Sequence, residues 1–294
     1  FGGRMQYEKF PEIARHLISS LVNSLLTSLD SNVFSVLDEL AFIKSNSITD
    51  TYFNSFFTKQ FNIIKLSEAL LFGFLLYYAI SYLFSFLTCS HFQKPFSFIS
   101  RLFFSALLIH FSLPICEKVI DFFYLVSSIL RTIGLYIFPS ELSFSILYEK
   151  ISKLFFANLT LPFKFFSFDG ILKSFLSFGF VNLLFTYSIR FIFIKILVLL
   201  SPIAFLSLCL DQSTWIFKIW LKNFIAQLFT QIIICVVLLI IYSLDTVSNP
   251  TMVKLLYIAS VVCLMRASSF VKDFSSGFTS DISSTFSSIK NMFL

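Results

Sequence analysis

Charged side chains are scarce in this chain: Asp, Glu, Lys and Arg make up only 13% of its 294 residues. In an ordinary water-soluble domain, about a quarter of the residues are charged. This shortage of charge therefore excludes a water-soluble domain. Glycine is scarce too, with seven residues, whereas hydrophobic residues account for 57%. A transmembrane β-barrel would show short alternating segments separated by turn residues, and this sequence does not. We therefore expect an all-α fold, a polytopic transmembrane helical bundle.

Patterns that carry catalysis or bind metals are also missing. His16, His91 and His110 stand in separate segments, and the five cysteines show no CxxC spacing. Zinc sites need their ligands close together, and the spacings typical of zinc peptidases, serine hydrolases and phosphate-binding loops are absent as well. We therefore expect no enzyme, no cofactor and no metal site, and we interpret the cysteines as free thiols in apolar surroundings.

The net charge of +6 does not indicate a nucleic-acid site, because the basic residues stand singly or in pairs beside apolar runs. A site for nucleic acid gathers Lys and Arg into one patch. Cations that flank apolar runs are typical of membrane proteins, in which they lie at the lipid surface. We therefore expect membrane lipid among the partners of the chain.

The hydrophobic pattern divides the chain into three regions, namely an amphipathic helical region over residues 1–65, a transmembrane helical domain over 66–268 and a C-terminal tail over 269–294. Helix-spaced apolar positions in the first region predict helices over about 11–29 and 33–44, and a third helix begins near Thr49 or Asp50, either of which suits its N-cap. The tail carries Phe or Ile at steps of three or four between serines, which predicts an amphipathic helix. No apolar segment typical of a cleavable signal peptide follows Phe1.

Several apolar runs approach the roughly 20 residues that cross a hydrocarbon layer, and they predict about five to seven spans. In chain order, these runs cover residues 66–88, 102–138, 172–210, 224–244 and 252–265. The second run contains Pro114 and three charges, so we interpret it as two spans with a tight connection; one helix whose charges face a wet cavity is the alternative. The third run is either two spans or one long kinked helix. Residues 139–169 predict one or two helices along the membrane interface.

The distribution of Lys and Arg predicts an orientation, because membrane proteins concentrate these residues in their cytoplasmic loops. Residues 89–101, residues 211–223 and the tail carry them, while residues 245–253 carry none. We therefore predict a cytoplasmic C-terminus and, with an odd number of crossings, N-terminal helices on the external face.

The segment from Arg190 to Leu244 is the part of the chain that suggests a function. It consists of two apolar runs joined by a polar elbow at residues 211–223. Arg190 and Lys195 stand inside the first run, where a simple membrane anchor would carry no charge. Both either extend to one lipid interface or line a wet conduit for a polar substrate. Pro202 predicts a kink, since proline removes a backbone donor and clashes with the preceding turn.

Polar side chains continue into the second run. Asn223, Gln227 and Gln231 follow one another at steps of four, so they form a stripe on one face of a helix. Such amides commonly hydrogen-bond to neighbouring helices in lipid, and lining of a conduit is the alternative. We interpret the elbow as an interfacial helix, because it carries side chains suited to anchoring at the level of the lipid headgroups. These candidate anchors are Trp215, Lys218, Trp220 and Lys222.

The same segment shows a characteristic order of residues. An apolar run ends in Ser-Pro and further apolar residues, the elbow opens on Thr, and Trp-Leu-Lys leads into a helix that contains glutamines. The residues concerned are Leu200, Ser201, Pro202, Ile203, Ala204, Thr214, Trp220, Leu221, Lys222, Phe224, Gln227 and Gln231. This order resembles the TrbL family, the polytopic inner-membrane subunits of type IV secretion and conjugation systems.

The resemblance implies a channel or scaffold subunit without enzyme activity in a bacterial inner membrane, with an organellar inner membrane as the alternative location. Such a subunit assembles with copies of itself and with other secretion-system subunits, and it contacts translocated DNA or protein. Two other functions are compatible with the sequence. A small-molecule transporter would have paired broken helices. A structural subunit of a respiratory or other organellar membrane complex would suit a composition with 43 phenylalanines.

Overall fold

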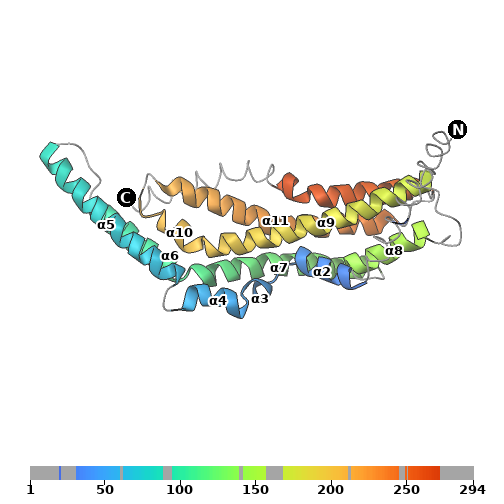
Figure 1. Ribbon diagram of the computed structural model, residues 1–294, viewed down its shortest axis with the longest axis horizontal. Coiled ribbons are helices and arrows are strands. Elements are labelled where there is room, and N and C mark those ends of the chain that lie inside the picture. Colours follow the sequence, from blue (N-terminus) through green and yellow to red (C-terminus); the bar gives the residue numbers. More distant parts are fainter. Residues whose placement is uncertain are drawn as a thin grey trace, which may run out of the picture. The chain divides into compact units, whose positions relative to one another are not determined.

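The computed structural model describes most of the chain apart from its ends and several connections. The described residues are 20, 31–59, 62–88, 95–138, 142–156, 168–210, 213–244, 249 and 251–271. Every regular element in these residues is a helix (Figure 1), which confirms the expected all-α fold. The helix predicted over 11–29, apart from Ser20, and the tail from residue 272 onward lie outside the described residues.

Three short helices open the main described part of the chain, namely α2 over Ser31–Ala41, α3 over Ser45–Ile48 and α4 over Thr51–Thr58. α2 and α4 lie close to the positions that the sequence predicts, and α3 is additional. Asp50 precedes α4 with the extended backbone of an N-cap, but its side chain makes no capping hydrogen bond. The carboxylate of Asp50 has another role, described below.

Longer helices follow, namely α5 over Ile63–Thr88, α6 over Pro95–His110, α7 over Ser112–Ile137, α9 over Phe168–Leu199, α11 over Thr214–Ser243 and a last helix over Thr251–Val271. Among the described residues, four helical stretches are long and apolar enough to cross a membrane. The count rises to five if α6 and α7 together form one span. The predicted range of about five to seven spans therefore meets the structure only at its lower end.

The connection between α6 and α7 differs from the prediction. The two helices meet at Phe111 with a bend of 65°, and Pro114 lies in the first turn of α7. The charged residues Glu117, Lys118 and Asp121 therefore lie within α7 and not in a connection. Proline is tolerated in a first helical turn because the N–H groups there have no intrahelical acceptor. The chain consequently breaks before the proline and not at the charges.

α9 is one continuous helix of 32 residues, so the run from residue 172 onward begins with a single long helix and not with two spans. It ends at Leu199, and the short helix α10 follows over Ser201–Leu206. α11 begins at Thr214 and contains 30 residues, so most of the polar elbow forms its first turns and is not a separate interfacial helix. Within the predicted interfacial region, the structure has α8 over Phe144–Phe156.

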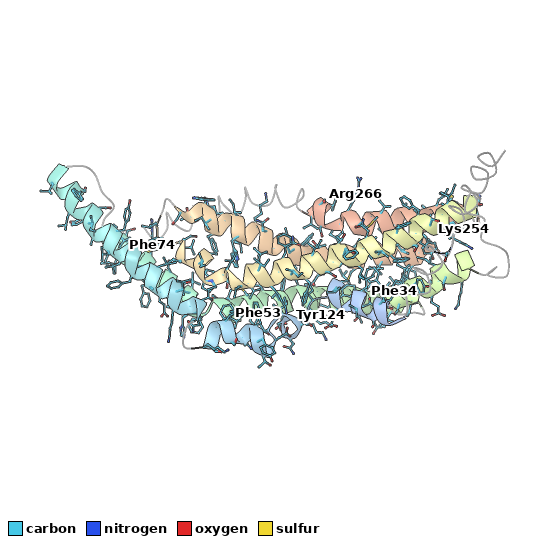
Figure 2. All side chains as sticks on the ribbon, viewed as in Figure 1. Phe34, Phe53, Phe74, Tyr124, Lys254 and Arg266 are labelled. Carbon is cyan, nitrogen blue, oxygen red and sulfur yellow. The ribbon has the colours of Figure 1, made fainter. Side chains whose placement is uncertain are left out.

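α5 exposes apolar side chains along its whole length, and Figure 2 shows them projecting from the helix. Phe72 and Leu83, for example, are each 64% exposed. The opposite face, which includes Ser67 and Phe74, packs inward, and Tyr78 stacks on Phe98 of α6 with ring centroids 3.7 Å apart. An apolar helix with one packed face and an apolar outer face suits a lipid environment.

The contacts group the chain into two compact units, and α7, α9 and α11 contribute residues to both. Unit 1 comprises Phe1–Phe42, Val126–Ile189 and Gln231–Ala267, and unit 2 comprises Ile43–Leu125, Arg190–Thr230 and Ser268–Leu294. This grouping is defined by contacts between residues. The predicted division into residues 1–65, 66–268 and 269–294 is defined by the expected position relative to the membrane, and it stays a prediction.

In unit 1, α2 packs on α8. Phe34 stacks on Tyr148 with ring centroids 4.2 Å apart and meets Phe180 of α9 edge-on at 5.3 Å. The backbone N–H of Phe144 donates a hydrogen bond of 2.9 Å to the carboxylate of Asp38. This N–H opens α8, where the helix dipole favours a negative charge. α2 therefore caps α8 through a residue 106 positions away in the sequence.

Two glycines let helices approach closely in unit 1. Gly134 of α7 faces the side chain of Leu142, and an added Cβ there would also lie 3.1 Å from Leu239 Cδ2 of α11. Gly179 of α9 faces the last helix, and its added Cβ would lie 3.0 Å from Val261 Cγ1. At both positions the missing side chain, and not the freedom of the backbone, explains the glycine.

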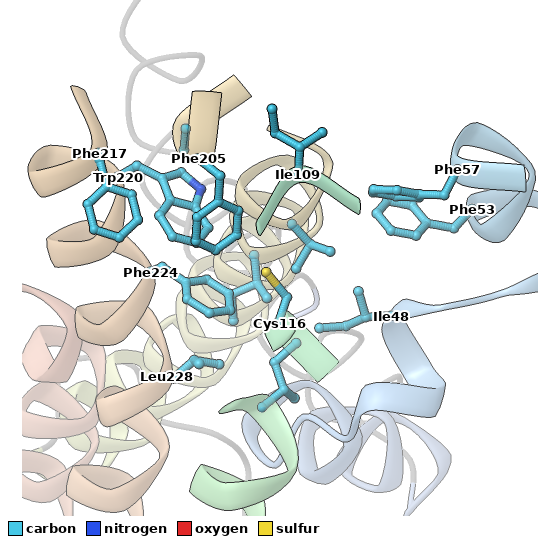
Figure 3. Close-up of a cluster of buried hydrophobic side chains, with 14 of the residues drawn as sticks. Ile48, Phe53, Phe57, Ile109, Cys116, Phe205, Phe217, Trp220, Phe224 and Leu228 are labelled. Atoms are coloured by element: carbon cyan, nitrogen blue, oxygen red, sulfur yellow. The ribbon is translucent and has the colours of Figure 1, made fainter. Parts of the chain in front are cut away.

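The core of unit 2 joins the short helices α3 and α4 to the ends of the longer ones (Figure 3). Its buried members are Ile43, Ile48, Phe53, Phe57, Ile109, Cys116, Ile120, Ile194, Val198, Ala204, Phe205, Leu206, Phe217, Trp220, Phe224 and Leu228. Side chains of α4 and of the first turns of α11 thus belong to one hydrophobic cluster. The predicted orientation, with the N-terminal helices on the external face and the elbow in the cytoplasm, stays a prediction.

Candidate functional site

Arg190 lies in the interior of unit 2. Its side chain is 2% exposed, and its Nε donates a hydrogen bond of 3.0 Å to the carbonyl oxygen of Gln227. Because Arg190 stands on α9 and Gln227 on α11, the guanidinium links these two helices. Burying a cation is costly unless it is hydrogen-bonded, and a charged side chain in an apolar helix usually faces protein or water. This position is not an extension to a lipid interface, and a conduit beside Arg190 stays a prediction.

Lys195 lies one and a half turns further along α9 in different surroundings. Its Nζ is 2.8 Å from the Asp50 carboxylate at the start of α4, and the two side chains are 26% and 56% exposed. The same Nζ lies 5.0 Å from the ring centroid of Phe191 and 5.9 Å from that of Phe53. An ammonium group over aromatic faces gains cation–π stabilisation in addition to the ion pair. Lys195 therefore attaches α4 to α9.

The amide stripe of α11 changes its surroundings along the helix. Asn223 is exposed, Gln227 is 8% exposed and Gln231 is 0% exposed. Gln227 Oε1 and both polar atoms of the Gln231 side chain have no hydrogen-bond partner among the described residues. The side chains of these two glutamines therefore do not make the expected interhelical hydrogen bonds there, although the Gln227 backbone does bind Arg190. Buried amides without partners cost about 1–3 kcal/mol each.

The four candidate anchors divide into two kinds of environment. Trp215 is 60% exposed and Lys218 is exposed, as expected of residues at a membrane surface. Lys222 is half-buried. Trp220 is only 7% exposed, and its Nε1 donates a hydrogen bond of 2.8 Å to the carbonyl of Leu197. Its ring stacks on that of Phe224 at 5.3 Å, so Trp220 is part of the core that joins α9 and α11.

The break between α9 and α10 is built from Ser201 and Pro202. Pro202 lies in the first turn of α10, so its missing N–H leaves the carbonyl of Val198 without the usual helical donor. The hydroxyl of Ser201 donates a hydrogen bond of 2.7 Å to that carbonyl. The serine thus replaces the donor that the proline lacks, and the helix ends and restarts around Leu200.

All four described cysteines are free thiols. Cys116, Cys209 and Cys235 are buried, whereas Cys263 is exposed, so the expected apolar burial holds for three of them. Burial raises the pKa of Cys209, which follows α10, to about 11. A thiol with so high a pKa carries little thiolate at neutral pH and is a poor nucleophile.

The structure brings Arg190 and Gln227 into contact but gives Lys195 a different partner. The pairing of Lys195 with Asp50 joins residues 145 positions apart. The sequence showed a lone carboxylate before an aromatic helix and a lone lysine in an apolar run, but it contained nothing that linked them. Arg190 was recognisable because a cation in an apolar run has to be compensated.

No protein-family model, curated protein or solved structure matches the chain. Within the described residues, no group of three or more His, Cys, Asp and Glu side chains could hold a metal ion. The fold and the site define a class of protein: all-helical in its described parts, with four to five apolar helices compatible with an integral membrane protein. Its distinguishing feature is an arginine buried in an apolar helix and bound to a second apolar helix.

Proposed function

We propose that the protein is a channel or scaffold subunit, without enzyme activity, of a type IV secretion or conjugative transfer apparatus. The resemblance to the TrbL family supports this proposal. The observation that carries it is Arg190, which is 2% exposed on an apolar helix and bound to the Gln227 carbonyl. A cation kept in such a position is a candidate functional site by default. The segment that holds it also carries the resemblance.

In this proposal, copies of the chain assemble with other secretion-system subunits in a bacterial inner membrane, with the C-terminus in the cytoplasm. Arg190, Lys195 and the amides Asn223, Gln227 and Gln231 line the path of translocated DNA or protein. Cations would attract the phosphates of DNA through the same charge attraction that dominates nucleic-acid binding. Because Arg190 is buried, the path requires α9 and α11 to separate there.

Charge substitutions test the proposed path. Arg190→Gln and Arg190→Glu are expected to abolish substrate transfer in cells, with the glutamate variant the more severe, while Lys218→Glu at an exposed position keeps transfer near the normal level. Membrane levels and gel filtration of each purified variant show whether the chain still folds. Normal transfer by a folded Arg190→Gln variant would contradict the proposed path.

Lys195 allows a sharper test because its partner is known. Exchanging the two charges, with Lys195→Asp and Asp50→Lys in one chain, keeps an ion pair between α9 and α4. If Lys195 serves only to hold α4, the exchange restores what Lys195→Asp alone loses. If the cation acts on the substrate, the exchanged chain stays defective in transfer, as the proposal expects.

Purification from the native membrane tests the assembly. The proposal expects secretion ATPases and other subunits of the apparatus to co-purify with the full chain in mild detergent. Co-purification of redox subunits would instead favour the structural subunit of a respiratory or organellar complex. If the chain purifies without partners, the small-molecule transporter would be the remaining candidate function.

One observation favours that transporter as a second candidate. Transporters place paired broken helices near the middle of the membrane, and α6–α7 supplies a second break in addition to α9–α10. Reconstitution in proteoliposomes separates the two functions. Uptake of a small solute by the chain alone would favour the transporter, because a subunit of a larger apparatus is expected to be inactive by itself.

A further inference from the structure

Two helix breaks in unit 2 share the same local design. α6 ends at His110, Phe111 forms the corner, and α7 opens with Ser112 and has Pro114 in its first turn. α9 ends at Leu199, Leu200 forms the corner, and α10 opens with Ser201 and Pro202. In both cases one residue separates two helices, and a serine and a proline begin the second. Proline makes a break at these places permanent, because it cannot continue the hydrogen bonds of the preceding helix.

The two breaks also lie against one another. α10 packs on both α6 and α5. The thiol of Cys116, one turn into α7, lies within reach of the hydroxyl of Ser201, which opens α10. Ile109 before the first break and Cys116 after it belong to one buried cluster (Figure 3). Val198 before the second break is a member of the same cluster. Each break is therefore part of the packing around the other.

The serine hydroxyls near the two breaks differ in whether they have hydrogen-bond partners. Ser201 donates to the carbonyl of Val198, so the second break keeps its polar groups paired. Ser112 is 0% exposed, and its Oγ has no hydrogen-bond partner among the described residues; the Oγ of Ser105 on α6, 1% exposed, is in the same situation. A buried hydroxyl without a partner costs free energy that another arrangement of the helices can recover. The first break is thus the less stable of the two in the observed arrangement.

We infer that the two breaks form one hinge, about which α5, α6 and α10 move as a body against α7 and α9. α6 packs on α10, so the angle at Phe111 cannot change alone without separating these two helices. A change of angle at Phe111 is therefore accompanied by a change at Leu200. Hinges of this kind absorb motion in a few residues at the ends of elements. The inference does not rest on the proposed secretion function.

The test measures the angle at Phe111 in the full chain in lipid nanodiscs. Spin labels introduced without cysteine chemistry at Phe103 of α6 and Phe122 of α7, which are 63% and 60% exposed, report the distance across this break. The hinge predicts two populations of distance. In Ser201→Cys, mild oxidation with diamide joins the new thiol to Cys116 and fixes α10 to α7, and one population is lost. Reduction restores it.

A matched control places a disulfide away from the hinge. Cys235 Sγ lies 3.5 Å from the carbonyl oxygen of Ser127 in unit 1, so oxidation of Ser127→Cys joins α7 to α11 there. This bridge is expected to leave both populations across Phe111 in place.

A second variant makes the test independent of disulfide formation. Pro202→Ala allows α9 to continue toward α10. The substitution is expected to shift the distribution of distances between the labels at positions 103 and 122, although residue 202 lies on a different helix from both labels. A distribution across Phe111 that neither the oxidised Ser201→Cys variant nor Pro202→Ala alters would overturn the single hinge.

Discussion

α5 and α11 are both long helices, of 26 and 30 residues, and in both the apolar side chains are distributed all around the helix. Their surroundings nevertheless differ. In the most apolar 18 residues of α11, 61% of the residues are buried inside the protein, against 6% in the most apolar 18 residues of the stretch Thr51–Ser85, which contains most of α5. Apolarity therefore shows that a helix avoids water, but not whether protein or lipid surrounds it.

The polar residues distinguish the two helices better than the apolar ones. α11 buries the amide side chains of Gln227 and Gln231, whereas Ser67 of α5, also buried, donates a hydrogen bond to its own helix at Ile63. Polar groups that are not satisfied within their own helix are tolerated only where protein or water surrounds them. A helix with amides in the middle of an apolar run is therefore the one to place in the interior.

The largest expected difference concerns apolar side chains of the same size. Leu228 on α11 is 0% exposed and Leu83 on α5 is 64% exposed. Leu228→Ala is expected to lower the free energy of unfolding by about 2–5 kcal/mol, because it leaves a cavity. Leu83→Ala is expected to change it by no more than about 0.5 kcal/mol. Unfolding in mixed micelles with increasing denaturing detergent measures both, and equal losses would mean that α5 is packed against protein.

Glycine substitutions are expected to act in opposite directions. Gly134→Ala places a Cβ against Leu142 and Leu239, so overpacking is expected to cost about 1–3 kcal/mol. A Cβ at Gly73 of α5 meets nothing within 4 Å in the described structure. Gly73→Ala is expected to stabilise the protein by up to about 1 kcal/mol through helix propensity alone. A destabilising Gly73→Ala in the native membrane but not in micelles would reveal a neighbour at that face.

The sequence predicted the all-helical fold because helix-period apolar positions and a shortage of charge leave few alternatives. It misplaced the break in the run 102–138, where the charges of Glu117 and Asp121 indicated a connection. Charge placement reflects which face of a helix is apolar, whereas a break requires a residue that cannot continue the helix. Pro114 was visible, but a proline can end one helix or begin the next, and only the bend at Phe111 decides.

The candidate site was predictable only in part, for reasons of sequence separation. Arg190 and the glutamines stood out because polar groups in an apolar run need compensation. The partners of the two cations could not be recognised in the sequence. Asp50 lies 145 positions from Lys195, and the carbonyl of Gln227, which binds Arg190, is a backbone group that no sequence pattern marks. Trp220 was interpreted as an anchor because tryptophan favours membrane interfaces. Its burial against Leu197 and Phe224 depends on how α9 and α11 cross.

Substitution of Gln231, the buried amide of α11, is expected to change the free energy of unfolding by less. The sign of this change shows whether the amide is hydrogen-bonded. Gln231→Leu removes polar atoms that have no hydrogen-bond partner within the described residues, in a side chain of similar size. We expect the free energy of unfolding to rise by about 1 kcal/mol. Asn223→Leu, on the exposed turn of the same stripe, is the control and should have little effect. A loss of stability in Gln231→Leu would show that the amide is hydrogen-bonded in the membrane.

The ion pair between Lys195 and Asp50 is expected to contribute less, because both side chains are partly exposed. A double-mutant cycle with Lys195→Met and Asp50→Asn should give a coupling free energy of about 0.2–1 kcal/mol, reduced by added salt. The pair joins the start of α4 to α9 and involves no residue of α11. A coupling well above 1 kcal/mol would indicate that the pair is shielded from water.

The smallest expected effect lies outside the apolar helices, in α8. A hydrogen bond from Lys153, 2.7 Å long, and the charge of that lysine lower the pKa of the Glu149 carboxyl. Because the pKa is lower in the folded state, the stabilisation is present above the unfolded pKa and is lost as the pH falls through the folded value. Both side chains are well exposed, so salt should weaken the pair. Carbon-13 titration should show the Glu149 pKa returning toward its ordinary value in Lys153→Met. An unchanged pKa would mean that water separates the two charges, and the same pH range would then leave the stability of α8 unaffected.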